Sequence, residues 1–95
     1  VFYFLEAMTE AGVQMGLSQE QAYHLATATF GGATHLARQS TDAPEVLRQR
    51  VTSKGGTTYA ALTSMAEDHV KEAFVKAMLA AQKRAGELGD EFGKD

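Results

Sequence analysis

The 95-residue sequence contains no cysteine, and this absence excludes two kinds of chemistry. Without a thiol the chain forms no disulfide and uses no thiolate as a nucleophile or metal ligand. A lack of disulfides is typical of proteins in reducing compartments. We therefore expect a cytoplasmic protein.

Proline is also nearly absent, since Pro44 is the only one in the chain. The hydrophobic content of 44% fits a folded segment, and the many alanines combined with few helix breakers favour helices. No segment has the pattern of a strand. The sequence predicts an all-α fold in a single domain, residues 1–95.

Positive charge is sparse: the chain has nine Lys and Arg residues and twelve Asp and Glu residues, which gives a formal net charge of −3. The cations are scattered and form no basic face of the kind that binds nucleic acid or an anionic membrane. Long hydrophobic runs are missing too: the longest, Val1 to Leu5, is far shorter than the ~20 residues of a membrane span and lacks the features of a signal peptide. We expect neither nucleic acid nor a membrane as a partner.

Two helices are predicted in the first 40 residues. Apolar residues recur at three- and four-residue steps from Phe2 to Leu17, and Gly16 is expected to end this helix. Ser18 followed by Gln21 forms a capping-box pattern that opens a second helix, which should run to about Ser40.

Three further helical segments are predicted in the rest of the chain. Pro44 suits the first turn of a short third helix, which ends in a glycine loop. From Thr57 the pattern is helical almost to the terminus, and the polar cluster 67–69 is the expected break into two helices. The charged tail 89–95 is expected to fray. We thus predict a bundle of four to five helices, with Glu67–Lys71 and Glu72–Lys76 ion pairs on a solvent face.

Two features predict close helix contacts or a partner surface. Val1 to Leu5 place apolar side chains on every side of the start of a helix. This is more apolar surface than a small helical unit can bury against itself. Gly31 and Gly32 lie in the middle of a predicted helix, where each costs about 0.5–1 kcal/mol relative to alanine. A tight helix crossing, within the chain or with a second subunit, would compensate for this cost, and ligand binding at these glycines is the alternative.

The segment from Val51 to Thr58 is the part of the chain built most like an anion site. Gly55 and Gly56 are flanked by four hydroxyl side chains and precede a predicted helix start, where N–H groups and the helix dipole suit a carboxylate or phosphate. A plain helix–turn–helix connection also uses Gly-Gly and a Ser or Thr cap, so the loop by itself leaves both interpretations open.

The three histidines do not predict a metal site. His24 and His35 share a face of one helix but lie roughly 16 Å apart along it. Neither has an Asp, Glu or His four residues further on, so we expect ordinary surface or hydrogen-bonded histidines and no metal.

The residues around the glycine loop follow a defined pattern: Pro44, Leu47, Val51, Thr52, Ser53, Gly55, Gly56, Thr58, Ala61, Leu62 and Met65. This pattern resembles the signature of pyrroline-5-carboxylate reductase, the enzyme of the last step of proline biosynthesis. The resemblance extends over nearly all 95 residues but only over the C-terminal third of such an enzyme. Two residues depart from it: proline is commoner than Lys54 before the glycine pair, and an acidic or amide residue is usual at Ala66.

The resemblance implies a function and a set of site residues. The chain would be the C-terminal dimerisation and substrate-binding domain, and it would form a homodimer with interleaved helices, with assembly beyond a dimer left open. Ser53, Gly55, Gly56 and Thr57 would bind the carboxylate of pyrroline-5-carboxylate. The Thr58 hydroxyl would face the ring nitrogen as the catalytic group. NADPH or NADH would be bound by an N-terminal domain absent from this chain, which begins with a valine inside an apolar pattern and reads as a fragment.

An alternative from another functional class is a helical protein-interaction module without chemistry. Composition and periodicity do not separate the two hypotheses. The signature between Pro44 and Met65 favours the reductase domain.

Overall fold

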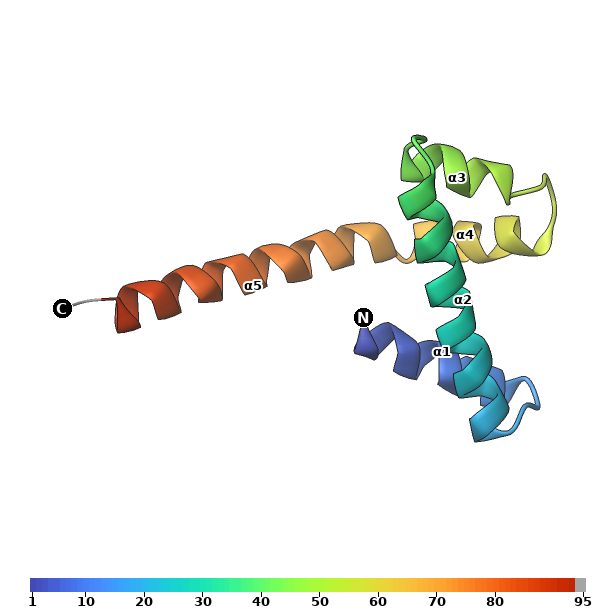
Figure 1. The fold of residues 1–95 in the computed structure, drawn as a ribbon, viewed down its shortest axis with the longest axis horizontal. Helices are drawn as coiled ribbons and strands as arrows, with labels where there is room; N and C mark the ends of the chain where they lie inside the picture. Colours follow the sequence, from blue (N-terminus) through green and yellow to red (C-terminus); the bar gives the residue numbers. More distant parts are fainter. Residues whose placement is uncertain (94–95) are drawn as a thin grey trace. The chain divides into compact units, whose positions relative to one another are not determined.

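The structure, a computed structural model, describes residues 1–93 and has five α-helices and no strand in that range (Figure 1). The helices are α1 (Phe2–Gln14), α2 (Gln19–Gln39), α3 (Pro44–Arg50), α4 (Thr57–Glu67) and α5 (Val70–Phe92). The predicted all-α class and the five helical segments are confirmed. The chain forms two compact units, Val1–Arg48 and Gln49–Asp95.

The turn between α1 and α2 is determined by local sequence. Gly16 has φ +108°, and the N–H groups of Gly16 and Leu17 donate to the carbonyls of Val13 and Gly12, both at 3.0 Å. This is a Schellman arrangement, in which a left-handed glycine closes the last turn of a helix. Ser18 then caps α2: its hydroxyl accepts from the Gln21 N–H and its own N–H donates to the Gln21 side chain, both at 3.1 Å. The predicted helix end and capping box are both confirmed.

The first unit is held together where α1 passes α2. A Cβ built on Gly12 would come 2.8 Å from the Cβ and 3.4 Å from the Cα of Ala22, so the two helices touch there almost at backbone distance. Ala22 and Ala26 of α2 and Thr9 of α1 are buried. The core of this unit is therefore small, and it depends on short side chains.

Three threonine hydroxyls are bonded to the backbone of their own helix. Thr9 donates to the Leu5 carbonyl at 2.7 Å and Thr29 to that of Leu25 at 2.7 Å. Thr27 donates to the His24 carbonyl at 2.9 Å. These threonines satisfy their hydroxyl protons without a neighbouring helix.

The tight crossing predicted at Gly31 and Gly32 is not formed within the first unit. Apart from the adjacent residues and the nearby backbone of α2 itself, no atom of this unit lies within 4 Å of a Cβ built on either glycine. Contact within the chain gains no support here. Contact with a second subunit and ligand binding both stay predictions. The close approach that the unit does contain is at Gly12.

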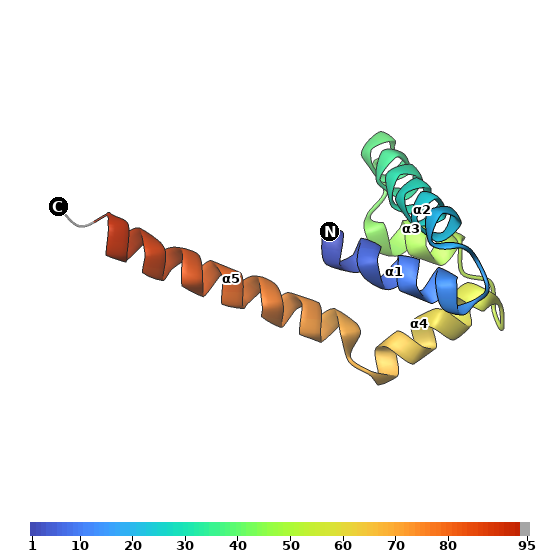
Figure 2. The same cartoon turned by 90° about the horizontal axis from the view of Figure 1, so that it is seen from below.

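In the second unit, α4 and α5 are separated by the break predicted at residues 67–69. Asp68 is the C-cap of α4, and His69, with φ +53° and ψ +41°, lies in the left-handed region that non-glycine residues seldom adopt. Both views show α5 running away from α4 rather than folding back along it (Figures 1 and 2). Among residues 49–91 and Gly93 of this unit, none is buried.

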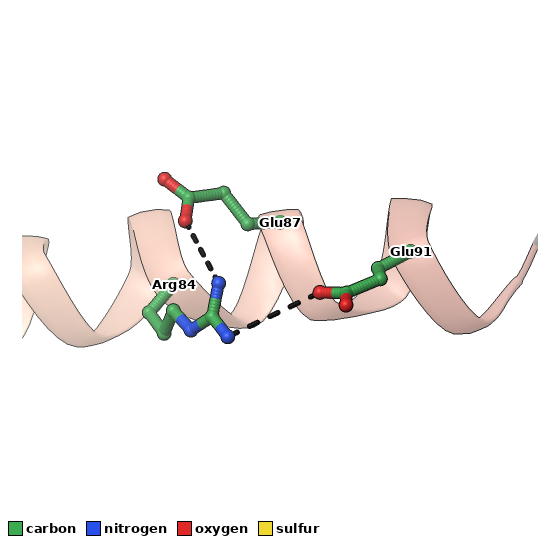
Figure 3. A network of polar contacts seen from close by, with 3 residues as sticks. All are labelled: Arg84, Glu87 and Glu91. Atoms are coloured by element: carbon green, nitrogen blue, oxygen red, sulfur yellow. Dashed lines mark hydrogen bonds and ion pairs between the residues drawn. The ribbon is translucent and has the colours of Figure 1, made fainter.

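The predicted surface ion pairs are wrong, and others take their place. Glu67 ends α4 whereas Lys71 belongs to α5, so the break places them on different helices, and neither this pair nor Glu72–Lys76 is among the ion pairs of residues 1–93. Instead, Arg84 Nη1 lies 3.1 Å from Glu87 Oε2, and Nη2 lies 4.0 Å from Glu91 Oε2 (Figure 3). These pairs span one and two turns of α5, and all three side chains are about half exposed, so their contribution to stability is small.

The last helix extends beyond the predicted fraying point. Its ordered backbone runs past Gly89 to Phe92, and the Gly93 N–H donates to the Gly89 carbonyl at 2.7 Å. Residues 94 and 95 of the predicted tail lie outside the described residues. Among the helices described, none is both long and apolar enough to span a membrane.

Candidate functional site

The glycine loop, residues 51–56 of the second unit, follows α3 in the chain and leads into α4. The Thr52 N–H donates to the Gln49 carbonyl at 3.2 Å and closes the end of α3. The Gly56 N–H then donates to the Ser53 carbonyl at 3.0 Å, and Gly55 has φ +75°. Residues 53–56 thus form a β-turn with the features of type II, in which the third residue needs positive φ and is usually glycine. The two glycines predicted to shape this loop do so for different reasons.

The lack of a side chain at Gly56 matters for the position of the Ser53 side chain rather than for the backbone angles of residue 56. Its φ of −85° and ψ of −174° are open to any residue. A Cβ on Gly56, however, would overlap Ser53 Oγ and lie 3.3 Å from the Ser53 carbonyl oxygen. The serine hydroxyl therefore packs directly against residue 56.

Gly56 is also the N-cap of α4, and no side chain caps this helix. The first intrahelical bond runs from the Ala60 N–H to the Gly56 carbonyl at 3.1 Å. The N–H groups of Thr57, Thr58 and Tyr59 precede it and make no hydrogen bond within the helix. They point towards the helix N-terminus, where the macrodipole favours an anion.

The structure brings the predicted site residues into one short segment. Ser53 and Gly55 lie in the turn, Gly56 at the cap, and Thr57 and Thr58 in the first turn of α4. Ser53 and Thr57 are exposed, while Thr58 is half-buried. A hydroxyl, a set of unpaired amides and a second hydroxyl thus lie within seven residues, which suits a carboxylate whose neighbouring atom also needs a hydrogen bond.

One predicted donor is already in use. The Gly56 N–H was expected to bind an anion, but it closes the turn onto Ser53. The amides left available at this helix start are those of Thr57, Thr58 and Tyr59. The sequence does not show this, because the turn type depends on backbone angles that Gly-Gly leaves open.

The other candidate groups do not come together. Among the described residues, no three His, Cys, Asp or Glu side chains gather to hold a metal ion. His24 and His35 lie on the exposed part of α2, and His69 lies at the break between α4 and α5. Two shallow grooves lie on the first unit. One is lined by Phe2, Leu5, Glu6, Thr9, Glu10, Val13, Gln19 and Tyr23, and the other by Val1, Phe30, Gly31, Thr34, His35 and Arg38.

The fold and the loop define a class of protein: an all-α domain with little core of its own and a glycine turn that presents uncapped amides at a helix start. Comparison with known proteins identifies the family. Residues 1–88 match the family model described as pyrroline-5-carboxylate reductase dimerisation. The chain belongs to this family.

Individual relatives agree with the family match. The chain is 40% identical over 93 residues to the pyrroline-5-carboxylate reductase of Pseudomonas aeruginosa, covering 98% of this chain and 34% of that protein. It is 37% identical over 92 residues to pyrroline-5-carboxylate reductase 2 of Bacillus subtilis, covering 97% of this chain and 33% of that protein. The chain thus spans about a third of the length of the curated relatives it matches.

A solved structure shares the helical arrangement. The crystal structure of Plasmodium falciparum pyrroline carboxylate reductase with NADP bound aligns with a TM-score of 0.84 at 29% sequence identity. The alignment covers 87% of this chain and 34% of that one.

Proposed function

We propose that residues 1–95 form the C-terminal dimerisation and substrate-binding domain of an NAD(P)H-dependent pyrroline-5-carboxylate reductase. The enzyme would reduce 1-pyrroline-5-carboxylate to L-proline in proline biosynthesis, in the cytoplasm. The main support is the arrangement of Ser53, Gly55, Gly56, Thr57 and Thr58 at the start of α4, inside the stretch that matches the family model. Relatives from bacteria, plants and archaea have the name of this reductase.

The glycine turn would hold the carboxylate of the substrate. The Ser53 hydroxyl and the amides of Thr57 and Thr58 are donors at the positive end of the α4 dipole. Gly56 would contribute by its lack of a side chain, because only glycine leaves the Ser53 hydroxyl where it lies. Gly55 would supply the positive φ of the turn.

Thr58 would be the catalytic group of this chain. Its hydroxyl lies one residue further along α4 than Thr57 and can donate to a ring atom next to the carboxylate-bearing carbon. Reduction of the C=N bond adds a hydride to carbon and a proton to nitrogen. Thr58 would therefore stabilise or deliver the proton at nitrogen.

The residues of this chain do not fit a nicotinamide nucleotide. Residues 1–93 contain no strand, and the sequence contains no Gly-x-Gly-x-x-Gly motif of the kind that holds a pyrophosphate. The dinucleotide, which supplies the hydride, would be bound by a separate domain. The NADP in the Plasmodium falciparum structure supports its use by this family.

A second copy of the chain would complete the hydrophobic core as an interleaved homodimer. In the first unit only Ala22, Ala26 and Thr9 are buried, and residues 49–91 and Gly93 of the second unit include no buried residue. Phe74 and Met78 lie one turn apart on α5 and are 44% and 52% exposed. A stable domain needs more buried area than this, and the family model is one of dimerisation.

A chimaeric enzyme tests the proposal. Residues 1–95 would replace the corresponding third of the Pseudomonas aeruginosa reductase, and NADPH oxidation with pyrroline-5-carboxylate would be measured. We expect activity within about tenfold of the parent enzyme, since the replaced part is 40% identical. The control is nucleotide binding by fluorescence, which depends on the unchanged domain.

Thr58→Val in this chimaera removes the hydroxyl but keeps the branched shape. Loss of a positioned acid costs about 10²–10⁴ in rate, so kcat should fall in that range at alkaline pH, where the imine is mostly neutral. Ser53→Ala should mainly raise KM, because it removes a contact present in the ground state and the transition state alike. An unchanged kcat for Thr58→Val would restrict the site to carboxylate binding.

The chimaera also distinguishes the alternative function. A dimeric, nucleotide-binding chimaera without reductase activity would favour a helical interaction module over a substrate-binding domain. The family match and the glycine turn both favour the reductase.

A further inference from the structure

The charge around the glycine turn differs in sign from that of the whole chain. From Val46 to Ala66 there is no Asp or Glu, and the three charged residues are Arg48, Arg50 and Lys54. The chain as a whole has a formal charge of −3. The segment proposed to bind a carboxylate is therefore a positive stretch in an acidic protein.

Lys54 is the cation inside the turn itself. It occupies the second position of the β-turn formed by residues 53–56, next to the Ser53 hydroxyl on one side and Gly55 on the other. Its side chain is exposed and makes no ion pair or hydrogen bond with any residue from 1 to 93. The ammonium group is therefore free to interact with a ligand at the helix start.

The backbone does not require a lysine at this position. The second residue of a type II turn is often proline, because its φ is near −60° and its N–H is not needed for the turn. The Lys54 N–H makes no hydrogen bond within the described chain. The turn geometry thus accepts proline as well, so the backbone does not account for a lysine here.

We infer that Lys54 is a specificity-determining residue that attracts the substrate carboxylate by charge. This inference rests on the proposed function, because it concerns the same site. Lys54 acts beside the hydrogen bonds of Ser53 and the α4 amides and does not replace them. For a separation of about 6 Å between an ammonium and a carboxylate group, the attraction strengthens binding about threefold in a water-like dielectric. At half that dielectric constant the gain is about tenfold.

Salt dependence separates this role from a structural one. In the active chimaera, Lys54→Gln and Lys54→Pro should raise KM for pyrroline-5-carboxylate about three- to tenfold at low ionic strength, with kcat changed less than about twofold. The difference should vanish at about 1 M salt, where the screening length is about 3 Å. Lys54→Arg should keep the original KM, and Lys83→Gln on α5 is the control for loss of one charge.

Inhibition by the product tests the ligand group that Lys54 recognises. L-proline has the carboxylate, whereas prolinamide does not. Lys54→Gln should weaken inhibition by L-proline about three- to tenfold at low salt, and should not weaken inhibition by prolinamide, which is a cation without a carboxylate. If Lys54→Gln weakened inhibition by both compounds equally, Lys54 would affect only the shape of the turn, and the inference would be wrong.

The outcomes for the two proposals are distinct. If the unmodified chimaera is active but the KM of Lys54→Gln equals that of the original at every salt concentration, the role of Lys54 is refuted and the proposed function stands. If the unmodified chimaera binds nucleotide but has no activity, the proposed function fails and the inference fails with it.

Discussion

Residue 56 illustrates how one missing side chain determines the position of another. The Ser53 hydroxyl lies where the Cβ of any larger residue 56 would be. This contact is between neighbours in one turn, so it is independent of how the two units of the chain are arranged. The absence of a side chain at residue 56 therefore leaves the Ser53 hydroxyl its place in the turn.

Gly56→Ala should displace the serine hydroxyl without unfolding α4, because the backbone angles of residue 56 suit alanine. In the active chimaera we expect a rise in KM at least as large as that of Ser53→Ala, and helicity by circular dichroism that is unchanged. The double variant Ser53→Ala/Gly56→Ala is the control, since without the hydroxyl the added methyl group has less to displace. If Gly56→Ala alone kept the original KM, the contact would not matter for binding.

At the scale of single helices, the ends were predictable because their causes are local. The Ser18 and Gln21 capping box, the left-handed Gly16 and the start at Pro44 each depend on residues no more than a few positions apart. The break after Glu67 was also predicted from its polar cluster. The left-handed conformation of His69 was not, since nothing about a histidine signals positive φ.

Contacts between helices were less predictable from sequence. Gly31 and Gly32 were the conspicuous helical glycines, yet the close approach within the first unit is at Gly12. Which glycine faces a neighbour depends on the crossing of α1 with Ala22 of α2, and periodicity alone does not give that crossing. The same holds for the site: Gly-Gly predicted a turn, but not that the Gly56 N–H would be used to close it.

The Gly12 contact leads to a stability prediction. Gly12→Ala should destabilise the chain by about 1–3 kcal/mol through overpacking against Ala22, although alanine is the better helix former. Gly86→Ala in α5 meets no atom within 4 Å and should stabilise by up to about 1 kcal/mol. Urea unfolding of both variants at one protein concentration checks this. If both variants changed the free energy of unfolding equally and in the same direction, the tight contact at Gly12 would be refuted.

For the whole molecule, association is the expected route to stability. The isolated chain should be helical and dimeric, because Phe74, Met78 and other apolar side chains stay exposed in a single copy. Met78→Glu should weaken the dimer at least tenfold in sedimentation equilibrium. Ala80→Glu, about 200° round the helix from Met78, is the control for adding a carboxylate and should have a smaller effect.

A well-folded monomer of the original chain at tens of micromolar would contradict this model. Gly31→Leu provides a further check on α2. A Cβ at Gly31 meets no other helix of its own unit, so loss of the dimer with retained helicity would locate the partner at Gly31.

The threonines bonded to their own helices bear on what such a partner would meet. Thr29 and Thr27 are polar by composition, yet each hydroxyl proton is already donated to a backbone carbonyl of α2. Covering them would strip water from the hydroxyl groups without leaving an unpaired donor, which is the main penalty for burying such a group. For association, this part of α2 is therefore closer to an aliphatic surface than its sequence indicates, and counts of apolar residues underestimate how much of the helix can become dry.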